Sequence, residues 1–248
     1  NFNKSYGTVL SEGKCHALLA NKLSEALKKN IYFVPRIYAD ELIKDTPEYL
    51  MDLGKVINKN IKILYCGKDV VSKTIKPQHK KQLNRQTRNE IIYWDNYYAN
   101  DYCPRRLFLG PWKGRYGIKN ILFNLTGMIE TDLLIIDIIS NCSKLENSNY
   151  NYKKALEKNK IPKQFNNIRK FFNSPNCNED IKKIEINITQ KTFDSIEFML
   201  WEWKSNIALE WYPYLLGLKH DLQLNSETLS YDRILKTQTS PLSNILLK

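Results

Sequence analysis

Apolar and β-branched residues gather in four short runs along the first part of the chain, with stretches of helical apolar spacing between them. The runs predict strands at residues 31–38, 61–66, 90–96 and 118–125, and the spacing predicts helices at 13–29, 47–58, 78–88 and 128–142. Successive runs start roughly 30 residues apart, which is the length of one βαβ unit. Nearly continuous apolar strands, each followed by a helix, are typical of a parallel sheet covered on both faces. We therefore predict an α/β domain over residues 1–145.

The predicted helices differ in how their apolar residues are arranged. In residues 13–29 one face carries Leu19, Leu23, Ala26 and Leu27. Residues 78–88 are polar and only weakly amphipathic, and their basic side chains are typical of a solvated helix face.

The pattern changes after residue 142. Asn, Lys and Ser accumulate between residues 143 and 184, and Pro162 and Pro175 interrupt any long helix. We predict a linker there, and an α-helical C-terminal domain as the remainder of residues 146–248.

Helix signals resume near residue 194. Asp194 and Glu197 have the spacing of a capping box and precede an apolar helical stripe. Pro213 is expected to start a second helix, and residues 226–235 a third.

Four βα units are compatible with two architectures. An open doubly wound sheet usually carries a glycine-rich phosphate turn, and neither GxGxxG nor GxxxxGK[ST] occurs. A closed (β/α)8 barrel usually needs about 250 residues, so four units would be half of one and would leave two unpaired parallel edges. The pattern by itself leaves a small open sheet and a half-barrel as alternatives.

The composition is that of an ordinary globular protein. The 248 residues are 42% hydrophobic and 26% charged, with 9 Gly and 9 Pro, which excludes the disordered, collagen-like and disulfide-rich classes. The apolar runs fall short of the roughly 18 residues of a membrane span, so we expect a soluble protein. The first residue is Asn1 and no signal-peptide pattern follows it, which indicates a chain cut from a longer one.

The net charge of +12 raises the question of an acidic partner such as nucleic acid. Lysine is spread through segments rich in Asn and Ile, so we favour compositional drift over a polyanion site. The five cysteines are odd in number, widely separated and without CxxC spacing. This pattern predicts neither a zinc site nor a disulfide framework.

The segment with the most chemistry is YWDNYYANDYCPRRLFLGPWKGR at residues 93–115. Strand-to-helix loops form the active face of α/β barrels, so Trp94, Asn96 and Asp101 would project where ligands bind. An aromatic platform beside an amide and a carboxylate suits a sugar, which has a flat apolar face and many hydroxyls. Alternatively, the polar residues cap the next helix and the aromatic rings fill the barrel rim.

The run WDNYYANDYCPRRLFLGPWKGR resembles the signature of glycoside hydrolase family 84, the β-N-acetylglucosaminidases that include protein O-GlcNAcase and some enzymes labelled hyaluronidases. A weaker resemblance extends over residues 10–140, including 34–38 and 67–72, and says nothing about residues 150–248. The resemblance implies a (β/α)8 TIM barrel, of which these strands look like the last four. The expected fold is therefore the C-terminal half of a barrel followed by a helical region.

Members of this family hydrolyse terminal β-linked N-acetylglucosamine by substrate-assisted catalysis with an oxazoline-like intermediate. The resemblance implies an adjacent Asp-Asp pair at the end of the fourth strand, one Asp orienting the acetamido group and the other acting as acid and base. Residues 1–13 contain no Asp, so we expect this chain to begin after the pair and to carry no catalytic residue. The alternative is a pseudoenzyme that has lost the pair.

The same resemblance assigns five residues to sugar binding. Asp101 and Asn124 match residues that bind the outer hydroxyls, and Asn96 matches one near the acetamido and glycosidic region. Tyr38 and Trp94 match residues around the acetamido group.

Some positions depart from the family pattern or have a structural interpretation. Tyr65-Cys66-Gly67 stands where members commonly have Trp-Thr-Gly, and Asn124 lacks the frequent following proline. We expect Arg115 to form a structural ion pair.

The expected partner is a glycan or glycoprotein that contains N-acetylglucosamine, with no cofactor, metal, nucleic acid or membrane. Attached helical domains in this family sometimes pair, so a homodimer through the helical region is a further expectation. The competing hypotheses are a carbohydrate-binding barrel without catalysis and a polyanion binder.

Overall fold

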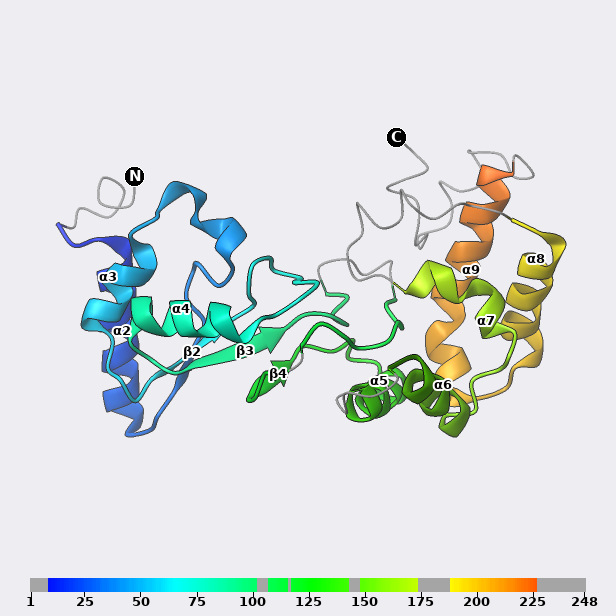
Figure 1. Cartoon of the computed structure of the whole chain (residues 1–248). Coiled ribbons are helices and arrows are strands. Elements are labelled where there is room, and N and C mark those ends of the chain that lie inside the picture. The colour runs from blue at the N-terminus through cyan, green and yellow to red at the C-terminus, as the bar shows by residue number, and fades with distance from the viewer. Residues whose placement is uncertain (1–8, 102–106, 116, 143–147, 174–187, 227–248) are drawn as a thin grey trace. The chain divides into compact units, whose positions relative to one another are not determined.

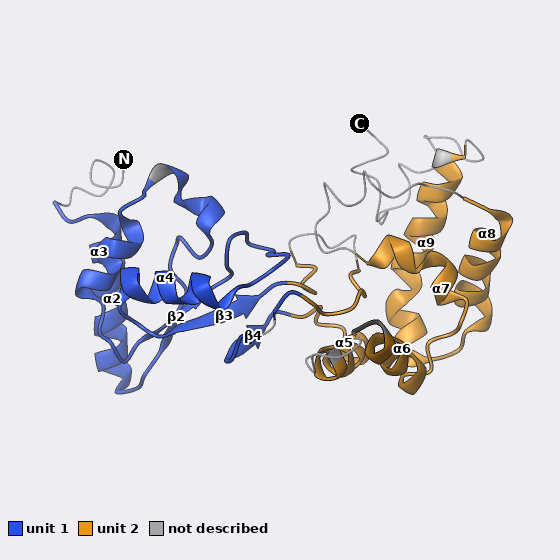
Figure 2. Ribbon diagram, viewed as in Figure 1, with its two compact units in different colours: residues 1–96, 114–124 blue, residues 97–113, 125–248 orange. Residues whose placement is uncertain are grey.

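The computed structural model describes residues 9–101, 107–115, 117–142, 148–173 and 188–226 (Figure 1). The chain forms two compact units (Figure 2). Residues 1–96 and 114–124 make unit 1, and residues 97–113 and 125–248 make unit 2. The predicted domain boundary at residue 145 lies outside the described residues and stays a prediction.

Unit 1 contains a sheet of four parallel strands in the order β1-β2-β3-β4. The strands are β1 (Tyr32–Phe33), β2 (Lys62–Tyr65), β3 (Ile91–Asp95) and β4 (Ile121–Phe123). Each lies inside a predicted run and is shorter than that run. The strand order follows the chain order, as in consecutive units of a (β/α)8 barrel, and the predicted α/β class is confirmed.

Three helices cover one face of this sheet: α2 (Glu12–Leu27), α3 (Tyr49–Val56) and α4 (Pro77–Thr87). Between the helices and the sheet lies an apolar core that includes Ile63, Tyr65 and Ile91 from alternate strand positions. A short 3-10 helix, η1 (Asp40–Asp45), follows the first strand. Pro77 starts α4 at a position where its missing N–H has no intrahelical partner to lose.

Two glycines let the helices approach each other closely. A Cβ on Gly13 of α2 would lie 2.4 Å from the Tyr49 carbonyl oxygen of α3. A Cβ on Gly54 of α3 would lie 2.5 Å from the Gln86 carbonyl oxygen of α4. The backbones therefore pack at distances that no other residue permits at these positions.

The leucine face of α2 is not the face that packs. Its buried residues are Gly13, Ala17, Ala20 and Ser24, whereas Leu19, Leu23 and Leu27 are 57%, 48% and 59% exposed. Close contact with α3 needs small side chains, so the large apolar ones lie on a neighbouring face of the helix.

No helix among the described residues of unit 1 covers the second face of the sheet. Tyr32 and Leu122 on this face are 62% and 48% exposed. A hollow runs along it, lined by Tyr32, Lys62, Leu64, Ile92, Asn120, Ile121 and Leu122. In a closed barrel this face would be the packed interior.

Unit 2 is helical. Its elements are α5 (Ile129–Cys142), α6 (Ser148–Lys158), α7 (Phe165–Ile168), η2 (Arg169–Phe172), α8 (Gln190–Glu197), the π-helical turn η3 (Phe198–Glu202) and α9 (Asn206–Asn225). The predicted helical character after residue 145 is present, but the linker prediction is wrong for the described residues 148–172. These residues form helices because Tyr152, Phe165 and Phe172 are buried.

The two helix starts predicted here are also corrected. Thr189 caps α8 in a capping box with Thr192, so the helix starts before Asp194. Pro213 lies inside α9 instead of starting it. The apolar stripe of Trp211, Leu215, Leu218 and Leu222 is fully buried, and this packing outweighs the one hydrogen bond that Pro213 removes. The third predicted helix lies outside the described residues, apart from Ser226.

Trp211 is the centre of the core of unit 2. Its ring lies 5.3 Å from the ring of Phe165 and 5.4 Å from that of Trp203. Its indole N–H donates to the hydroxyl of Thr131 in α5 at 3.0 Å. The packing thus joins α5, α7 and α9 through one side chain.

Candidate functional site

Polar and aromatic side chains gather at the carboxyl ends of the strands of unit 1. Tyr38 follows β1, Trp94 lies near the end of β3, and Asn96 and Asn124 directly follow β3 and β4. The carboxyl ends of parallel strands meet at one edge of a sheet, which is where α/β barrels bind ligands.

Tyr38 and Trp94 form the aromatic part of this cluster. Their ring centroids lie 6.1 Å apart with the planes tilted by 48°, and both side chains are half-buried. Trp94 alternates with Tyr93 along β3, so it lies on the face of the sheet opposite the described helices of unit 1. The pair can offer an apolar wall to a ligand.

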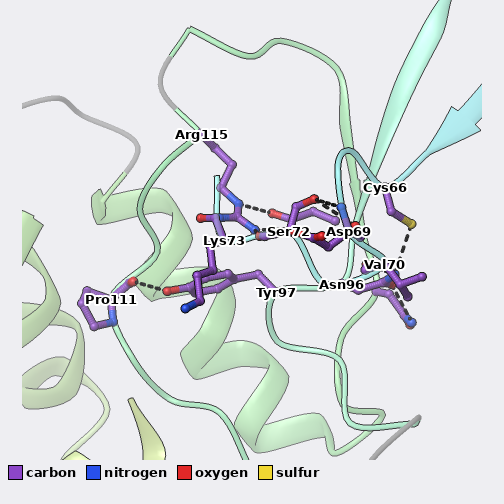
Figure 3. Close-up of polar contacts among 11 residues, drawn as sticks. Cys66, Asp69, Val70, Ser72, Lys73, Asn96, Tyr97, Pro111 and Arg115 are labelled. Carbon is purple, nitrogen blue, oxygen red and sulfur yellow. Dashed lines mark hydrogen bonds and ion pairs between the residues drawn. The ribbon is translucent and has the colours of Figure 1, made fainter. Parts of the chain in front are cut away.

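Asn96 joins the ends of three strands. Figure 3 shows it beside Cys66 and Val70. Its amide nitrogen donates to the Val70 carbonyl oxygen at 2.9 Å and to the Cys66 sulfur at 3.2 Å. Its amide oxygen accepts from the side-chain nitrogen of Asn124 at 3.2 Å. Because a carbonyl oxygen can only accept, the contact with Val70 decides which end of the Asn96 amide is nitrogen, and Asn124 must turn its donor toward Asn96.

Cys66 lies beneath this amide in a dry environment. Burial, and to a lesser degree the charge of Asp95, raises the pKa of its thiol to about 12. The side chain therefore remains a neutral thiol. Cys66 is the second residue of Tyr65-Cys66-Gly67, which differs from the Trp-Thr-Gly common in the family. In this chain the cysteine accepts a hydrogen bond from Asn96 and helps to hold its amide in place.

Arg115 holds the loop after β2 against the end of β3. Its guanidinium makes two hydrogen bonds of 2.9 Å to the carboxylate of Asp95, and both side chains are buried. It also donates to the carbonyl oxygens of Ser72 and Lys73. The interpretation of Arg115 as a structural ion-pair residue is confirmed. The full set of hydrogen bonds offsets the cost of burying the two charges.

The structure brings together four of the five predicted site residues: Tyr38, Trp94, Asn96 and Asn124. Asp101 belongs to unit 2, where it is exposed. Its role in sugar binding stays a prediction.

Several contacts that shape the site could not be predicted from the sequence. The contact of Cys66 with Asn96 joins residues 30 positions apart. Gly67 has a φ of +112°, and a Cβ there would lie 2.7 Å from the Ser72 hydroxyl oxygen. A lone glycine after a strand could have indicated such a turn, but the partner of its loop could not be read from spacing.

The part of the chain that the structure describes contains neither a metal-ligand cluster nor a membrane-spanning helix. No three His, Cys, Asp or Glu side chains there lie close enough to share a metal ion. The helices of these same residues are all too short or too polar to cross a bilayer.

A parallel sheet with outer helices, and with an aromatic wall beside amides at its strand ends, is typical of barrel-type glycoside hydrolases. The family model described as beta-N-acetylglucosaminidase matches residues 7–167 of the chain. The chain belongs to this family, glycoside hydrolase family 84, as the segment 93–115 predicts.

Known proteins resemble the chain in sequence and in fold. Protein O-GlcNAcase of Rattus norvegicus and that of Mus musculus are each 33% identical to it over 101 residues, which is 39% of this chain and 11% of each relative. A mutant of the Thermobaculum terrenum O-GlcNAc hydrolase has a similar fold, with a TM-score of 0.66 and 18% identity over 99% of this chain and 60% of the other. The chain thus spans only a part of the proteins it resembles.

Proposed function

We propose that this chain is part of a β-N-acetylglucosaminidase that hydrolyses terminal β-linked N-acetylglucosamine, and that it contributes the sugar-binding half of the active site. The observation that carries the proposal is the cluster of Tyr38, Trp94, Asn96 and Asn124 at the strand ends. The tilted aromatic pair fits the methyl group and flat face of an acetamido sugar. The amides fit its polar groups.

The proposed reaction uses the substrate's own acetamido group. Its carbonyl oxygen attacks the anomeric carbon as the leaving oxygen takes a proton from a carboxylic acid, which gives an oxazoline-like intermediate that still carries the N–H proton, an oxazolinium ion. Water then opens the oxazoline with the same carboxylate acting as base, so the configuration is retained. In this chain Tyr38 and Trp94 would position the acetamido group, and Asn124 and Asp101 would bind the outer hydroxyls.

The two catalytic aspartates would come from residues outside this chain, since residues 1–13 contain no Asp. Two uncovered apolar surfaces of unit 1 support the need for a complementary half-barrel. One is the helix-free face of the sheet with Tyr32 and Leu122, and the other is the face of α2 with Leu19 and Leu23. The sheet face corresponds to the interior of a closed barrel, and the α2 face corresponds to the side on which a preceding βα unit would pack.

The proposed substrate is a glycoprotein or glycan that carries N-acetylglucosamine, in keeping with the name O-GlcNAcase of the rat and mouse relatives. A homodimer through the helical region is part of the same proposal. Trp201 and Leu209 in unit 2 are 50% and 75% exposed, and apolar side chains of this size suit a subunit interface.

The test is hydrolysis of an aryl β-N-acetylglucosaminide by a parent protein that contains both halves of the barrel. Asp101→Ala should lower kcat/KM at least about tenfold because it removes a contact to a sugar hydroxyl. Asn124→Asp should do the same because it replaces the amide donor that Asn124 turns toward Asn96 with a second acceptor oxygen. Asn120→Asp is the matched control, since Asn120 precedes β4 and is exposed at its opposite end. Equal rates in Asn124→Asp and wild type would remove Asn124 from the site.

The two competing hypotheses give different results in the same material. A parent that binds N-acetylglucosamine without cleaving the aryl glycoside would be a carbohydrate-binding barrel. A polyanion binder would retard nucleic acid in a gel and lose this binding steeply between two salt concentrations.

A further inference from the structure

A second polar cluster of unit 1 lies on the helix-covered face of the sheet, away from the residues assigned to the sugar. Asp40 of η1 is at its centre. One of its carboxylate oxygens accepts from the hydroxyl of Tyr65 at 2.8 Å, and the other lies 2.9 Å from Nε2 of His79 in α4. Nδ1 of His79 lies 3.1 Å from the hydroxyl of Tyr93 in β3.

The hydrogen-bond polarity of this cluster follows from its chemistry. An ionised carboxylate can only accept, so Nε2 of His79 carries a proton toward Asp40. Burial, and then the charge of Asp40, raises the pKa of Tyr93, so that its phenol keeps its proton. The Tyr93 hydroxyl can then donate to Nδ1, so both ring nitrogens of His79 have a hydrogen-bond partner. The imidazole ring also stacks on Tyr93 with an interplanar angle of 24°.

The cluster anchors the segment that carries Tyr38. Asp40 is two residues beyond Tyr38, and the backbone between them pairs with the loop after β2. The Cys66 N–H donates to the Tyr38 carbonyl oxygen at 2.7 Å, and the Asp40 N–H donates to that of Gly67 at 3.0 Å. An isolated bridge joins Ala39 and Gly67 between these two bonds.

We propose that Asp40 and His79 are positioning residues that set the distance and tilt between Tyr38 and Trp94, and that they thereby determine which N-acyl groups the sugar site accepts. This inference rests on the proposed function, because it assigns the Tyr38–Trp94 wall to the N-acyl group. It adds two residues that do not touch the sugar and that lie on the other side of the sheet.

The surroundings of the pair favour positioning over a contribution to stability. The side chains of His79 and Asp40 are 20% and 33% exposed, and polar pairs with this solvent access contribute little to folding. Their effect on geometry outweighs this small contribution to stability. The carboxylate of Asp40 joins η1, β2 and α4 directly after the segment that carries Tyr38. A small displacement of Asp40 moves the same strand end that carries Tyr38.

The first test is hydrogen exchange on this chain. His79→Phe keeps a ring for stacking and removes both hydrogen bonds. His16→Phe is the matched control, because His16 of α2 forms a similar His–Tyr pair with Tyr49 at 2.8 Å but does not touch Asp40. We expect the Asp40 and Glu41 amides to exchange at least about tenfold faster in His79→Phe and unchanged in His16→Phe. Equal protection of these amides in His79→Phe and wild type would overturn the anchoring role.

The second test is N-acyl selectivity in the parent protein with both barrel halves. The ratio of kcat/KM for the N-acetyl and N-propionyl aryl glucosaminides should fall at least about fivefold in His79→Phe. Asp40→Asn, which keeps one acceptor, should give an intermediate ratio, and His16→Phe the wild-type ratio. A general loss of stability would lower both rates and leave the ratio constant, which would overturn the selectivity role.

The two tests distinguish a failure of the roles assigned to Asp40 and His79 from a failure of the proposed glycosidase function. A parent that cleaves neither glycoside contradicts the proposed function and the selectivity role with it. The exchange measurement then still decides whether Asp40 and His79 anchor the Tyr38 segment.

Discussion

The amide of Asn96 accounts for much of the order at the strand ends. It contacts a carbonyl oxygen, a thiol and a second amide within 3.2 Å, and it is buried. A buried polar group without partners would cost free energy, so this set of contacts keeps Asn96 and Asn124 in one arrangement.

The thiol beneath Asn96 should be inert while the protein is folded. Burial raises the pKa of Cys66 to about 12, so at pH 8 only about one thiol in 10⁴ is ionised. We expect iodoacetamide to label Cys66 at least about 100-fold more slowly in the native chain than in the chain unfolded in urea, as measured by peptide mass spectrometry. Equal rates in both states would show that Cys66 is not buried.

The sequence identifies single site residues better than their contacts. Trp94 and Asn96 are recognisable because they lie in one continuous motif. The partners of Asn96 and of Asp40 come from other strands and loops. Their contacts depend on which segments the fold brings together, and spacing along one segment does not contain that information.

Helix packing in unit 1 depends on glycine at two crossings. Gly54→Ala adds a methyl group 2.5 Å from backbone atoms of α4. The gain in helix propensity is about 1 kcal/mol, but overpacking against backbone costs about 3 kcal/mol, so the free energy of unfolding should fall by about 2 kcal/mol. Urea denaturation measures this change. Met51→Ala on the exposed side of α3 is the control and should change it by less than about 0.5 kcal/mol.

The start of α5 is capped by a side chain from α9. The carboxylate of Glu210 accepts the N–H groups of Glu130 and Thr131 at 3.0 and 2.8 Å, and the Thr131 hydroxyl at 2.6 Å. Glu210→Ala leaves these donors without their acceptor and should lower the free energy of unfolding by about 2 kcal/mol. Glu210→Gln keeps one acceptor oxygen and should cost less. The prediction is wrong if both variants melt like the wild type.

Helices and strands were predictable where the local pattern agrees with the tertiary packing. The first four helices appear close to their predicted ranges, and the four strands lie inside theirs but are shorter, because buried parallel strands need continuous apolar runs. The orientation of α2 and the continuation of α9 through Pro213 could not be predicted from the sequence. In both, contacts with other helices decide the outcome over the local pattern.

At the scale of the whole molecule, the uncovered leucine face of α2 gives a direct test of the half-barrel. In this chain the triple change Leu19→Glu, Leu23→Glu and Leu27→Glu should leave the thermal midpoint within a few degrees, because these side chains are about half exposed. In a parent with the complementary half, the same change should cost several kcal/mol, since each buried leucine contributes about 2 kcal/mol. Equal effects in the two proteins would show that nothing packs on this face.

The sequence alone determined the family, the parallel α/β class and most of the candidate site residues. It could do so because a continuous motif and the period of the strands are local properties of the chain. Only the tertiary structure decided which face of α2 is buried, how Asn96 is oriented, and that Asp40 and His79 meet beside the segment of Tyr38. These outcomes depend on packing and hydrogen bonds between segments that are distant in the sequence, and such contacts exist only after the strands have paired.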